Sequence, residues 1–534
     1  MKKFLPLIKN RLGLFFAGLA TASVAGLLTA EIILTIKEGL EQNIDNVFLY
    51  KIIGFSVMAA SLGILSSYFT AKLTNITSRE LTKNLSHNIL EAEYEYVEDM
   101  ADKILPVMTR DIRYLAHFIN KFPPFVIAIT TLVITLVRMM IIDIDLTLYF
   151  LIIIVLQALL LVVLVPFIKK YTIKGISFDN LVYQGLSNMV SGLKELTLNK
   201  DKRQAFIGKV IIRDLKKMTS FHIRSRVIGG VSERMTELLT FVFMGIFMYL
   251  CFLYIDIDFE RFKVFLPIIL FIVPLMGKIS GFVRDSKEAG AALSQIQSLG
   301  VSVSKKKIDS PNPVPAIDPS SKKVIEFKEV TYSYPTSQHE RKLVFGPLNL
   351  SIEQGKTTFI IGGNGSGKTT FAKLFTGLYQ PTEGEIIYNG DVPINGSNLL
   401  SYRQLFSAYF ADSFTFKHLY HVDEEFLEEK GPQFIDLLEM GEKVSIEERS
   451  FSTTKLSFGQ RSRLALISNM LDDKPIYLFD EWAANQDPYF KAVFYQKILP
   501  YLQKAGKTTL VISHDEKYFS HADTIIELKE GMVT

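Results

Sequence analysis

The pattern of hydrophobic and polar positions divides the chain into two parts. Residues 12–282 contain long apolar runs with few charges, whereas residues 322–534 alternate short apolar stretches with helical patterns, as soluble α/β proteins do. About 20 apolar helical residues are enough to cross the roughly 30 Å hydrocarbon core of a bilayer. Six runs meet that condition, and they lie near residues 12–35, 50–73, 123–142, 146–168, 236–255 and 262–283.

The loops between these runs predict how the spans are oriented. The loops at about 74–122 and 169–235 are long and rich in Lys and Arg, whereas the others are short and mostly acidic. Because basic loops stay in the cytoplasm, we expect both termini and the two long loops there. A stretch rich in Pro, Ser and Lys follows the last span and reads as a solvated connector. The sequence therefore predicts a transmembrane domain over residues 1–300, a linker over 301–321 and an α/β domain over 322–534.

Composition fits a chain that is half membrane-embedded. The 534 residues are 48% hydrophobic, and the net charge of +4 is explained mostly by the basic loops, so we expect no nucleic-acid partner. The single cysteine, Cys251, excludes an internal disulfide and a cysteine-based metal cluster. The basic and apolar N-terminus resembles a secretory signal. Its apolar run continues to Leu34 and further spans follow, so we expect it to remain as an anchor.

A glycine-rich stretch is the first candidate functional motif. The sequence TTFIIGGNGSGKTT, residues 357–370, joins an apolar run to a helical start and satisfies G-x-x-x-x-G-K-[ST]. Such glycines let backbone N–H groups close around phosphate oxygens at the positive end of a helix. The complete motif argues against a chance turn and predicts a nucleotide site. In it Lys368 would reach the β- and γ-phosphates and Thr369 would hold Mg²⁺. The other expected contacts are Gly362, Asn364, Gly365, Ser366, Gly367 and Thr370.

Two adjacent carboxylates follow a second apolar run. The sequence PIYLF at 475–479 reads as a buried strand, so Asp480 emerges at its carboxyl end, where open α/β sheets bind ligands. Asp480 would help to orient Mg²⁺, and Glu481 has room to act as a general base or to position a water beside the γ-phosphate. A solvated acidic strand end is the common alternative. The phosphate loop upstream favours hydrolysis instead.

The stretch LSFGQRSRLAL, residues 456–466, resembles the signature of ATP-binding-cassette (ABC) ATPases. The resemblance implies that ATP is the nucleotide and that two cassettes are required. Ser457, Gly459 and Gln460 would contact an ATP molecule held by the phosphate loop of a second copy.

Three further motifs resemble the same family in order and spacing. His514 in VISHDEKYF matches the family's switch histidine, and Tyr334 in VTYSYP matches the aromatic residue that stacks on adenine. The sequence AANQD at 483–487 lies where the family has its dimer-contact loop. Each motif alone is weak, since a lone His or Tyr is usually structural. Together they imply an ATP hydrolase in which Lys368, Glu481 and His514 are catalytic.

A narrower resemblance covers both halves of the chain. The cassette stretch LFDEWAANQDPYFKAVFYQKILPYL and the loop stretch GLKELTLNKDKRQAF, residues 192–206, are similar to bacterial exporters of cyclic peptides, siderophore peptides and lasso microcins. This implies an all-α six-helix transmembrane domain of the type IV ABC exporter kind, domain-swapped and fused to an α/β P-loop cassette. It also implies a homodimer among the lipids of the bacterial cytoplasmic membrane, with a peptide-like cargo and long helices whose turning points press on the cassettes. A lipid or hydrophobic-drug exporter and a membrane-bound regulatory ATPase are the alternatives.

Two positions depart from the family pattern. Ala411 stands where most ABC exporters have Gln, which puts water positioning or coupling at that place in question. Phe458 stands where Gly is usual, but it need not touch phosphate, so we expect ATP binding to survive. Within the spans, Glu31 and Arg138 lie toward the outer ends. They would either snorkel to the interface or line a polar cavity that contacts the cargo.

Overall fold

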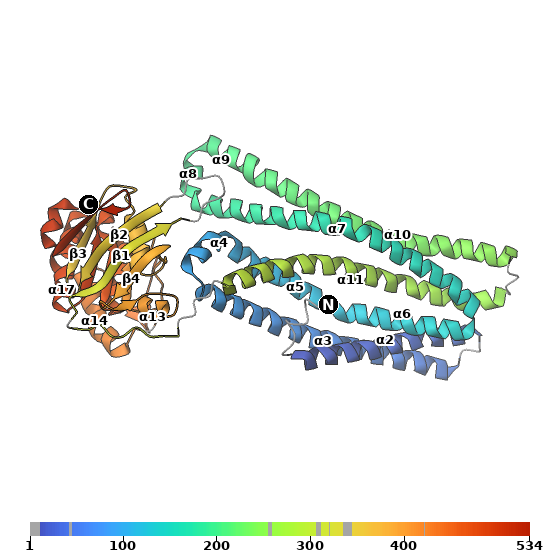
Figure 1. Ribbon diagram of the computed structural model, residues 1–534. Helices are drawn as coiled ribbons and strands as arrows, with labels where there is room; N and C mark the ends of the chain where they lie inside the picture. The colour runs from blue at the N-terminus through green and yellow to red at the C-terminus, as the bar shows by residue number, and fades with distance from the viewer. Residues whose placement is uncertain are drawn as a thin grey trace. The chain divides into compact units, whose positions relative to one another are not determined.

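The computed structural model describes residues 11–41, 45–254, 259–305, 311–319, 321–334, 344–420 and 422–534. The chain forms two compact units, which Figure 1 draws in ribbon form. The helical unit comprises Met1–Leu90 and Asp99–Lys305. The α/β unit comprises Glu91–Glu98 and Lys306–Thr534. A short segment from the first long loop therefore belongs to the α/β unit.

The helical unit is built from long helices joined by short turns. Among the described residues the helices are α2 (Leu12–Glu41), α3 (Asn46–Leu90), α4 (Tyr94–Pro106, of which the residues up to Glu98 belong to the α/β unit), α5 (Ile112–Ile119), α6 (Phe122–Ile142), α7 (Ile144–Ser191), the short α8 (Leu193–Leu198) and α9 (Lys200–Phe206), α10 (Arg213–Tyr254) and α11 (Phe259–Lys305). Two π-helical turns, η2 (Val107–Asp111) and η3 (Ile207–Ile212), interrupt them.

The helices run well past the predicted spans. Helix α7 has 48 residues, so at 1.5 Å per residue it is roughly 72 Å long, more than twice the thickness of the hydrocarbon core. Judged by length and composition, three stretches of the described residues are apolar enough to cross a membrane: Leu12–Gly39, Asn46–Leu90 and Tyr94–Ile142. The other three expected spans fall in α7, α10 and α11, and some side chains of these helices lie outside the residues that the structure describes.

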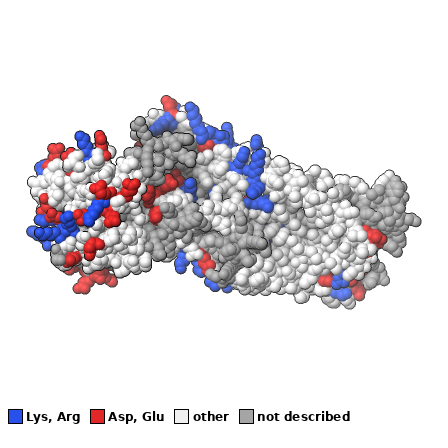
Figure 2. Space-filling view, viewed as in Figure 1, with Lys and Arg blue, Asp and Glu red and all other residues white. Residues whose placement is uncertain are grey.

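The helices pack through small and apolar side chains. Helix α2 packs on α3 and α6, and α7 lies alongside α10 (Figure 1). Figure 2 shows Lys and Arg side chains gathered over one part of this unit, beside a broad surface with few charges, as expected where a bundle leaves the bilayer. An apolar cluster inside the bundle consists of Ile33, Ala128, Leu132, Met139, Phe150, Ile268, Ile272 and Leu275.

The α/β unit contains two main sheets. The larger has the strand order β12-β11-β3-β10-β9-β6, and the smaller has the order β2-β1-β4-β5. The strands are β1 (Lys323–Ser333), β2 (Val344–Glu353), β3 (Thr357–Ile361), β4 (Glu383–Tyr388), β5 (Val392–Pro393), β6 (Phe406–Tyr409), β9 (Ile476–Asp480), β10 (Thr508–Ile512), β11 (Thr524–Lys529) and β12 (Met532–Val533), with a separate β7 (Ile446–Glu447) and β8 (Ser450–Phe451) pair.

Helices pack around these sheets. They are α12 (Lys368–Phe375), α13 (Leu399–Arg403), α14 (Glu424–Leu437), α15 (Phe458–Leu471), α16 (Pro488–Val493) and α17 (Leu499–Lys504), with the short turns η4 (Trp482–Asn485), η5 (Phe494–Ile498) and η6 (Glu516–His521). The strands β9 and β10 are buried along their whole length, which fits their mostly apolar sequences, IYLFD and TTLVI.

Candidate active site

Three parallel strands bring the predicted residues to one edge of the large sheet. Strand β10 pairs with β3 on one side and with β9 on the other, so that Ile512 lies beside both Ile360 and Asp480. The residues that follow these strands therefore leave the sheet together. The phosphate loop follows β3, Glu481 follows β9, and His514 lies two residues beyond β10.

The phosphate loop needs its glycines for two reasons. Gly362 and Gly367 have φ of +151° and +97°, values that side chains with a Cβ rarely adopt. A Cβ on Gly362 would lie 2.2 Å from the carbonyl oxygen of Leu528, and one on Gly367 would lie 2.4 Å from the ring of Phe345. The loop is therefore pressed against neighbouring strands, and its helix α12 begins directly at Lys368.

Two side chains of the loop are suited to hold phosphate. The Nζ of Lys368 donates to the carbonyl oxygens of Gly362 and Gly363 at 3.0 and 3.1 Å, which keeps the ammonium at the mouth of the loop. The hydroxyl of Ser366 is buried and has no partner among the described residues. Because buried polar groups are nearly always paired, an unpaired hydroxyl beside a helix N-terminus fits a phosphate oxygen.

A cavity of about 710 Å³ opens over this loop. Tyr334 lines it, and the hydroxyl of Tyr334 pairs with that of Thr370. The sequence did not single out Phe345 and Gly531, although both line the cavity and the N–H of Gly531 donates to the carbonyl oxygen of Ser366 at 3.0 Å. Only the pairing of distant strands brings them there. The remaining lining residues are Val344, Asn364, Gly365, Ser366, Gly367, Lys368, Thr369, Thr370, Glu481 and Glu530.

Glu481 lies between two partners. Its Oε1 is 3.3 Å from Nε2 of His514 and 4.0 Å from Nζ of Lys368. The backbone at Glu481 has φ of +54°, an uncommon value for a residue with a side chain, and its N–H donates to the carbonyl oxygen of Ile512. The three residues predicted to be catalytic, Lys368, Glu481 and His514, therefore lie together.

Asp480 is buried where Glu481 is not. Burial raises the pKa of Asp480 to about 6, the adjacent charge of Glu481 adds to the rise, and Lys368 opposes it. Among the described residues no group of three His, Cys, Asp or Glu side chains could hold a metal ion. Mg²⁺ commonly takes one or two protein ligands plus phosphate oxygens and water. Thr369 and Asp480 fit that donor set, in which Mg²⁺ would neutralise phosphate charge.

The signature residues lie elsewhere on the unit. Ser457 caps α15, since its hydroxyl accepts from the N–H of Gln460 and the Gln460 side chain accepts from the N–H of Ser457. The side chain of Gln486 donates to the carbonyl oxygen of Gly459 at 3.2 Å, which ties the predicted dimer-contact loop to the signature. None of Ser457, Gly459 and Gln460 is among the residues that line the cavity over this chain's own phosphate loop.

The two departures from the family pattern meet in a second cavity. Ala411 lies in a turn after β6, in which the N–H of Ser413 donates to the carbonyl oxygen of Phe410. Ala411, Phe458 and Arg461 line a cavity of about 250 Å³. Phe458 is half exposed, with the guanidinium of Arg461 5.9 Å from its ring centre, and it does not line the cavity over the phosphate loop.

The segment Glu91–Glu98 contacts the helix that begins at the phosphate loop. The carboxylate of Glu98 accepts from Nζ of Lys373 at 3.0 and 3.3 Å and from the hydroxyl of Tyr379 at 2.9 Å. The ammonium of Lys373 also lies 4.7 Å from the ring centre of Tyr379. Lys373 is on α12, so a change at Glu98 reaches the phosphate loop through a single helix.

Glu31 and Arg138 form an ion pair. The Nη2 of Arg138 lies 3.2 Å from Oε1 of Glu31, and both side chains are partly exposed. The pair joins α2 to α6, a contact that neither interpretation of these charges had included. Pairing lowers the free energy needed to hold two charges within the spans.

Comparison with known proteins supplies the family context. The family described as ABC transporter transmembrane region matches residues 12–279, and the family described as ABC transporter matches residues 345–484. The chain is 29% identical to ATP-binding protein SyrD of Pseudomonas syringae pv. syringae over 543 residues, which covers 97% of this chain and 94% of SyrD.

Other similar proteins are matched over shorter stretches. The ATP-dependent lipid A-core flippase of Vibrio cholerae serotype O1 is 31% identical over 224 residues, or 39% of this chain and 37% of the flippase. Antigen peptide transporter 2 of Rattus norvegicus is 28% identical over 236 residues, or 42% of this chain and 32% of that transporter.

Proposed function

Because the chain belongs to the ABC transporter family and is therefore an ATP-hydrolysing, multi-pass membrane transporter, we propose that it exports a peptide across the bacterial cytoplasmic membrane as a homodimer. Both termini would be cytoplasmic. The observation that carries the proposal is the meeting of Lys368, Glu481 and His514 at the mouth of a phosphate loop, in a chain similar to SyrD along almost its whole length.

The chemistry follows from the positions of these side chains. Lys368 binds the phosphates of ATP and stabilises the charge that builds up during γ-phosphoryl transfer. Glu481 accepts a proton from the attacking water or orients that water, and His514, 3.3 Å away, holds the Glu481 carboxylate in place. When Mg²⁺ is bound by Thr369 and Asp480, it supplies the neutralising charge for the phosphate oxygens.

The place of the signature supports the proposal of a homodimer. Ser457 and Gly459 do not line this chain's own phosphate cavity, yet Ser457 presents a capped helix N-terminus, a ready site for a phosphate oxygen. A second copy would supply that phosphate. Two ATP molecules would then draw two cassettes together, and loss of the γ-phosphate contacts would let them part.

The coupling of hydrolysis to transport would run through Glu98. The segment Glu91–Glu98 is continuous in sequence with α3 and α4, and it packs with the cassette through Lys373 and Tyr379. Movement of α12 after hydrolysis would therefore act on the helices that follow this segment. The domain-swapped arrangement of the two copies belongs to the same proposal.

The proposal also names the class of cargo, which is a peptide. The stretches that resemble peptide exporters lie in both halves of the chain, at residues 192–206 and in the cassette, and the similarity to SyrD also covers the transmembrane part that must recognise the cargo. The similarity to lipid A-core flippases extends over 39% of this chain. A cyclic, lasso or siderophore-type peptide therefore has more support than a lipid or a hydrophobic drug.

Purified protein in lipid vesicles tests the proposal. The ATPase rate is measured against cyclic peptides, siderophore precursors, lipids and dyes, and transport is measured for whichever compound stimulates it. We expect a peptide to raise the rate and to accumulate inside inverted vesicles. Stimulation by lipids or dyes and by no peptide would reject peptide cargo, whereas hydrolysis without transport of any compound would favour a regulatory ATPase.

A further inference from the structure

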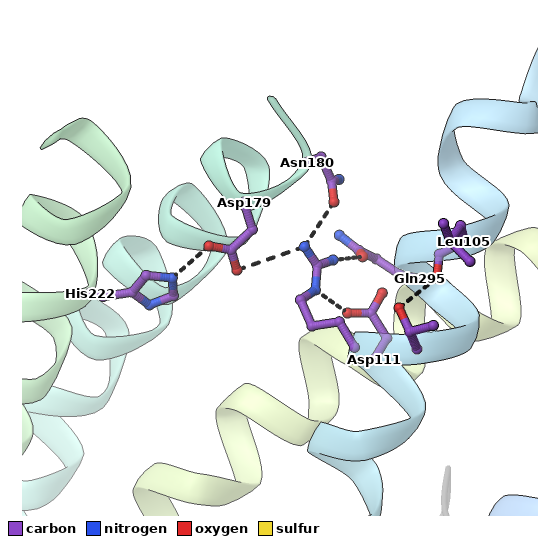
Figure 3. Close-up of polar contacts among 8 residues, drawn as sticks. Leu105, Asp111, Asp179, Asn180, His222 and Gln295 are labelled. Carbon is purple, nitrogen blue, oxygen red and sulfur yellow. Dashed lines mark hydrogen bonds and ion pairs between the residues drawn. The ribbon is translucent and has the colours of Figure 1, made fainter. Parts of the chain in front are cut away.

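The helical unit contains a buried polar cluster that the nucleotide chemistry does not use. At its centre is Arg110, in the π-helical turn η2, with a side chain only 9% exposed. All three nitrogens of its guanidinium have partners (Figure 3): Nε donates to Asp111 at 2.8 Å, Nη1 to Asn180 at 2.9 Å and Nη2 to Gln295 at 3.1 Å. One side chain therefore joins η2, α7 and α11.

Asp179 extends the cluster to a fourth element. Its Oδ2 lies 3.7 Å from Nη1 of Arg110, and its Oδ1 lies 3.0 Å from Nε2 of His222 on α10 (Figure 3). Asp111 is fully buried, and its second carboxylate oxygen has no partner among the described residues. Buried ion clusters are often less stabilising than apolar packing in the same space. The cluster therefore suits a role other than stability.

Helices α7 and α10 form one arm. The hydroxyls of Thr172 and Ser225 lie 2.7 Å apart and are buried, and the rings of Phe178 and Phe221 stack with centres 5.5 Å apart. Figure 1 shows the two helices side by side along most of their length. These contacts would be kept if the arm moved as a rigid body. The contacts of Arg110 would be lost in such a movement, because Asn180 belongs to the arm and Arg110 does not.

We propose that Arg110 is a positioning residue that latches the α7–α10 arm onto η2 and α11, and that nucleotide binding switches the latch between made and broken. The proposal rests on the proposed function, since it assumes that the helices move during the ATP cycle. When the arm leaves, Asn180 and Asp179 go with α7, while Gln295 and Asp111 stay with α11 and η2. A buried guanidinium that keeps only half of its hydrogen-bond partners has a high free energy. The latch is therefore either fully made or fully broken, with no stable state between.

Cysteine pairs distinguish a latch from a static contact. In a Cys251→Ser background, the double variant Asn180→Cys/Gln295→Cys places thiols on the two sides of the Arg110 guanidinium. A short, reducible thiol cross-linker is applied without nucleotide, with ATP, and with ATP and vanadate. We expect the cross-linking yield to differ at least about five-fold between states. We also expect linked protein to turn over ATP at least about ten-fold more slowly than the same double variant before linking and after reduction.

A matched pair within the arm is the control. The variant Thr172→Cys/Ser225→Cys is expected to link equally in every nucleotide state and to keep its turnover, because α7 and α10 move together. Equal yields for Asn180→Cys/Gln295→Cys in all states, together with full turnover after linking, would overturn the proposal. If the wild-type protein hydrolyses no ATP, the proposed function fails, while the yields with and without bound ATP still report on the latch.

A conservative variant gives a second measurement. Arg110→Lys keeps the charge but cannot bond Asn180 and Gln295 through one planar group. We expect turnover to fall about five-fold with an unchanged KM for ATP. Arg213→Lys is the control, because Arg213 is half exposed and pairs with its chain neighbour Asp214 on the same helix. Equal turnover of the two variants and wild type would contradict the latch.

Discussion

Replacing Glu98 tests whether the cassette and the membrane helices are coupled through this residue. The Glu98 carboxylate accepts hydrogen bonds from Lys373 and Tyr379, and also from the hydroxyl of Tyr94 at 3.2 Å. Hydrogen bonds to a charged group contribute about 1.5–3 kcal/mol when buried, and an exposed ion pair contributes about 0.2–1 kcal/mol. The Glu98 side chain is 41% exposed and that of Lys373 is 18% exposed, so solvent screens the interaction. We therefore assign about 2 kcal/mol to the whole contact and about 1 kcal/mol to its charge.

These magnitudes set the expected results. Glu98→Ala removes all of the bonds and is expected to lower the amount of cargo moved per ATP about thirty-fold, whereas Glu98→Gln removes only the charge and is expected to lower it about five-fold. The affinity for ATP should be unchanged, because neither Glu98 nor Lys373 lines the nucleotide cavity. Asp99→Ala, a neighbouring acid on the same helix, is the control.

The assay measures transport and ATP hydrolysis in the same vesicles, at low and at physiological ionic strength. Because salt screens partly exposed charges, the gap between Glu98→Gln and wild type should narrow as salt rises. A double-mutant cycle with Tyr379→Phe separates the hydroxyl contact from the ion pair. Unchanged transport per ATP in Glu98→Ala would refute coupling through this contact. A loss of ATP binding would show instead that Glu98 supports the phosphate loop.

Three further measurements test the site and the spans. Glu481→Gln should lower ATP turnover at least about a hundred-fold while nucleotide stays bound, and persistent hydrolysis would remove Glu481 from the base role. Between about pH 4 and pH 6 the folded cassette keeps a proton on Asp480 that the unfolded chain releases. The free energy of unfolding should therefore fall by about 3 kcal/mol as the pH rises through that window, and Asp480→Asn should abolish this slope in chemical denaturation. If the ion pair of Arg138 and Glu31 faces the cargo, Arg138→Ala should alter the cargo-stimulated ATPase rate without loss of folding. If the pair lies at the membrane–water interface, the variant should leave that rate unchanged.

The sequence predicted that Lys368, Glu481 and His514 belong to one site, because their positions follow from local rules. A glycine-rich turn after a strand must approach its ligand through the backbone, and a carboxylate after a buried strand must emerge at the sheet edge. The structure accordingly places Lys368, Glu481 and His514 together. It places Phe345 and Gly531 beside the same cavity, although no sequence motif predicted either residue. Their positions depend on strand pairing across more than 150 residues, which no local pattern records.

In the helical unit, the sequence predicted the helices but not the contacts between them. Hydrophobic runs predicted where helices lie, but a run of apolar residues does not state which of its faces meets which neighbour. Arg110 read as one of many cytoplasmic charges, and the usual interpretation of such a charge is a solvated helix face. Its burial follows from the meeting of η2, α7 and α11, which brings Asn180 and Gln295 to one guanidinium from positions 70 and 185 residues away. A buried charge whose partners come from separate helices loses some of those partners when the helices separate. The inference about movement therefore rests on the contact between helices and not on the sequence of any one helix.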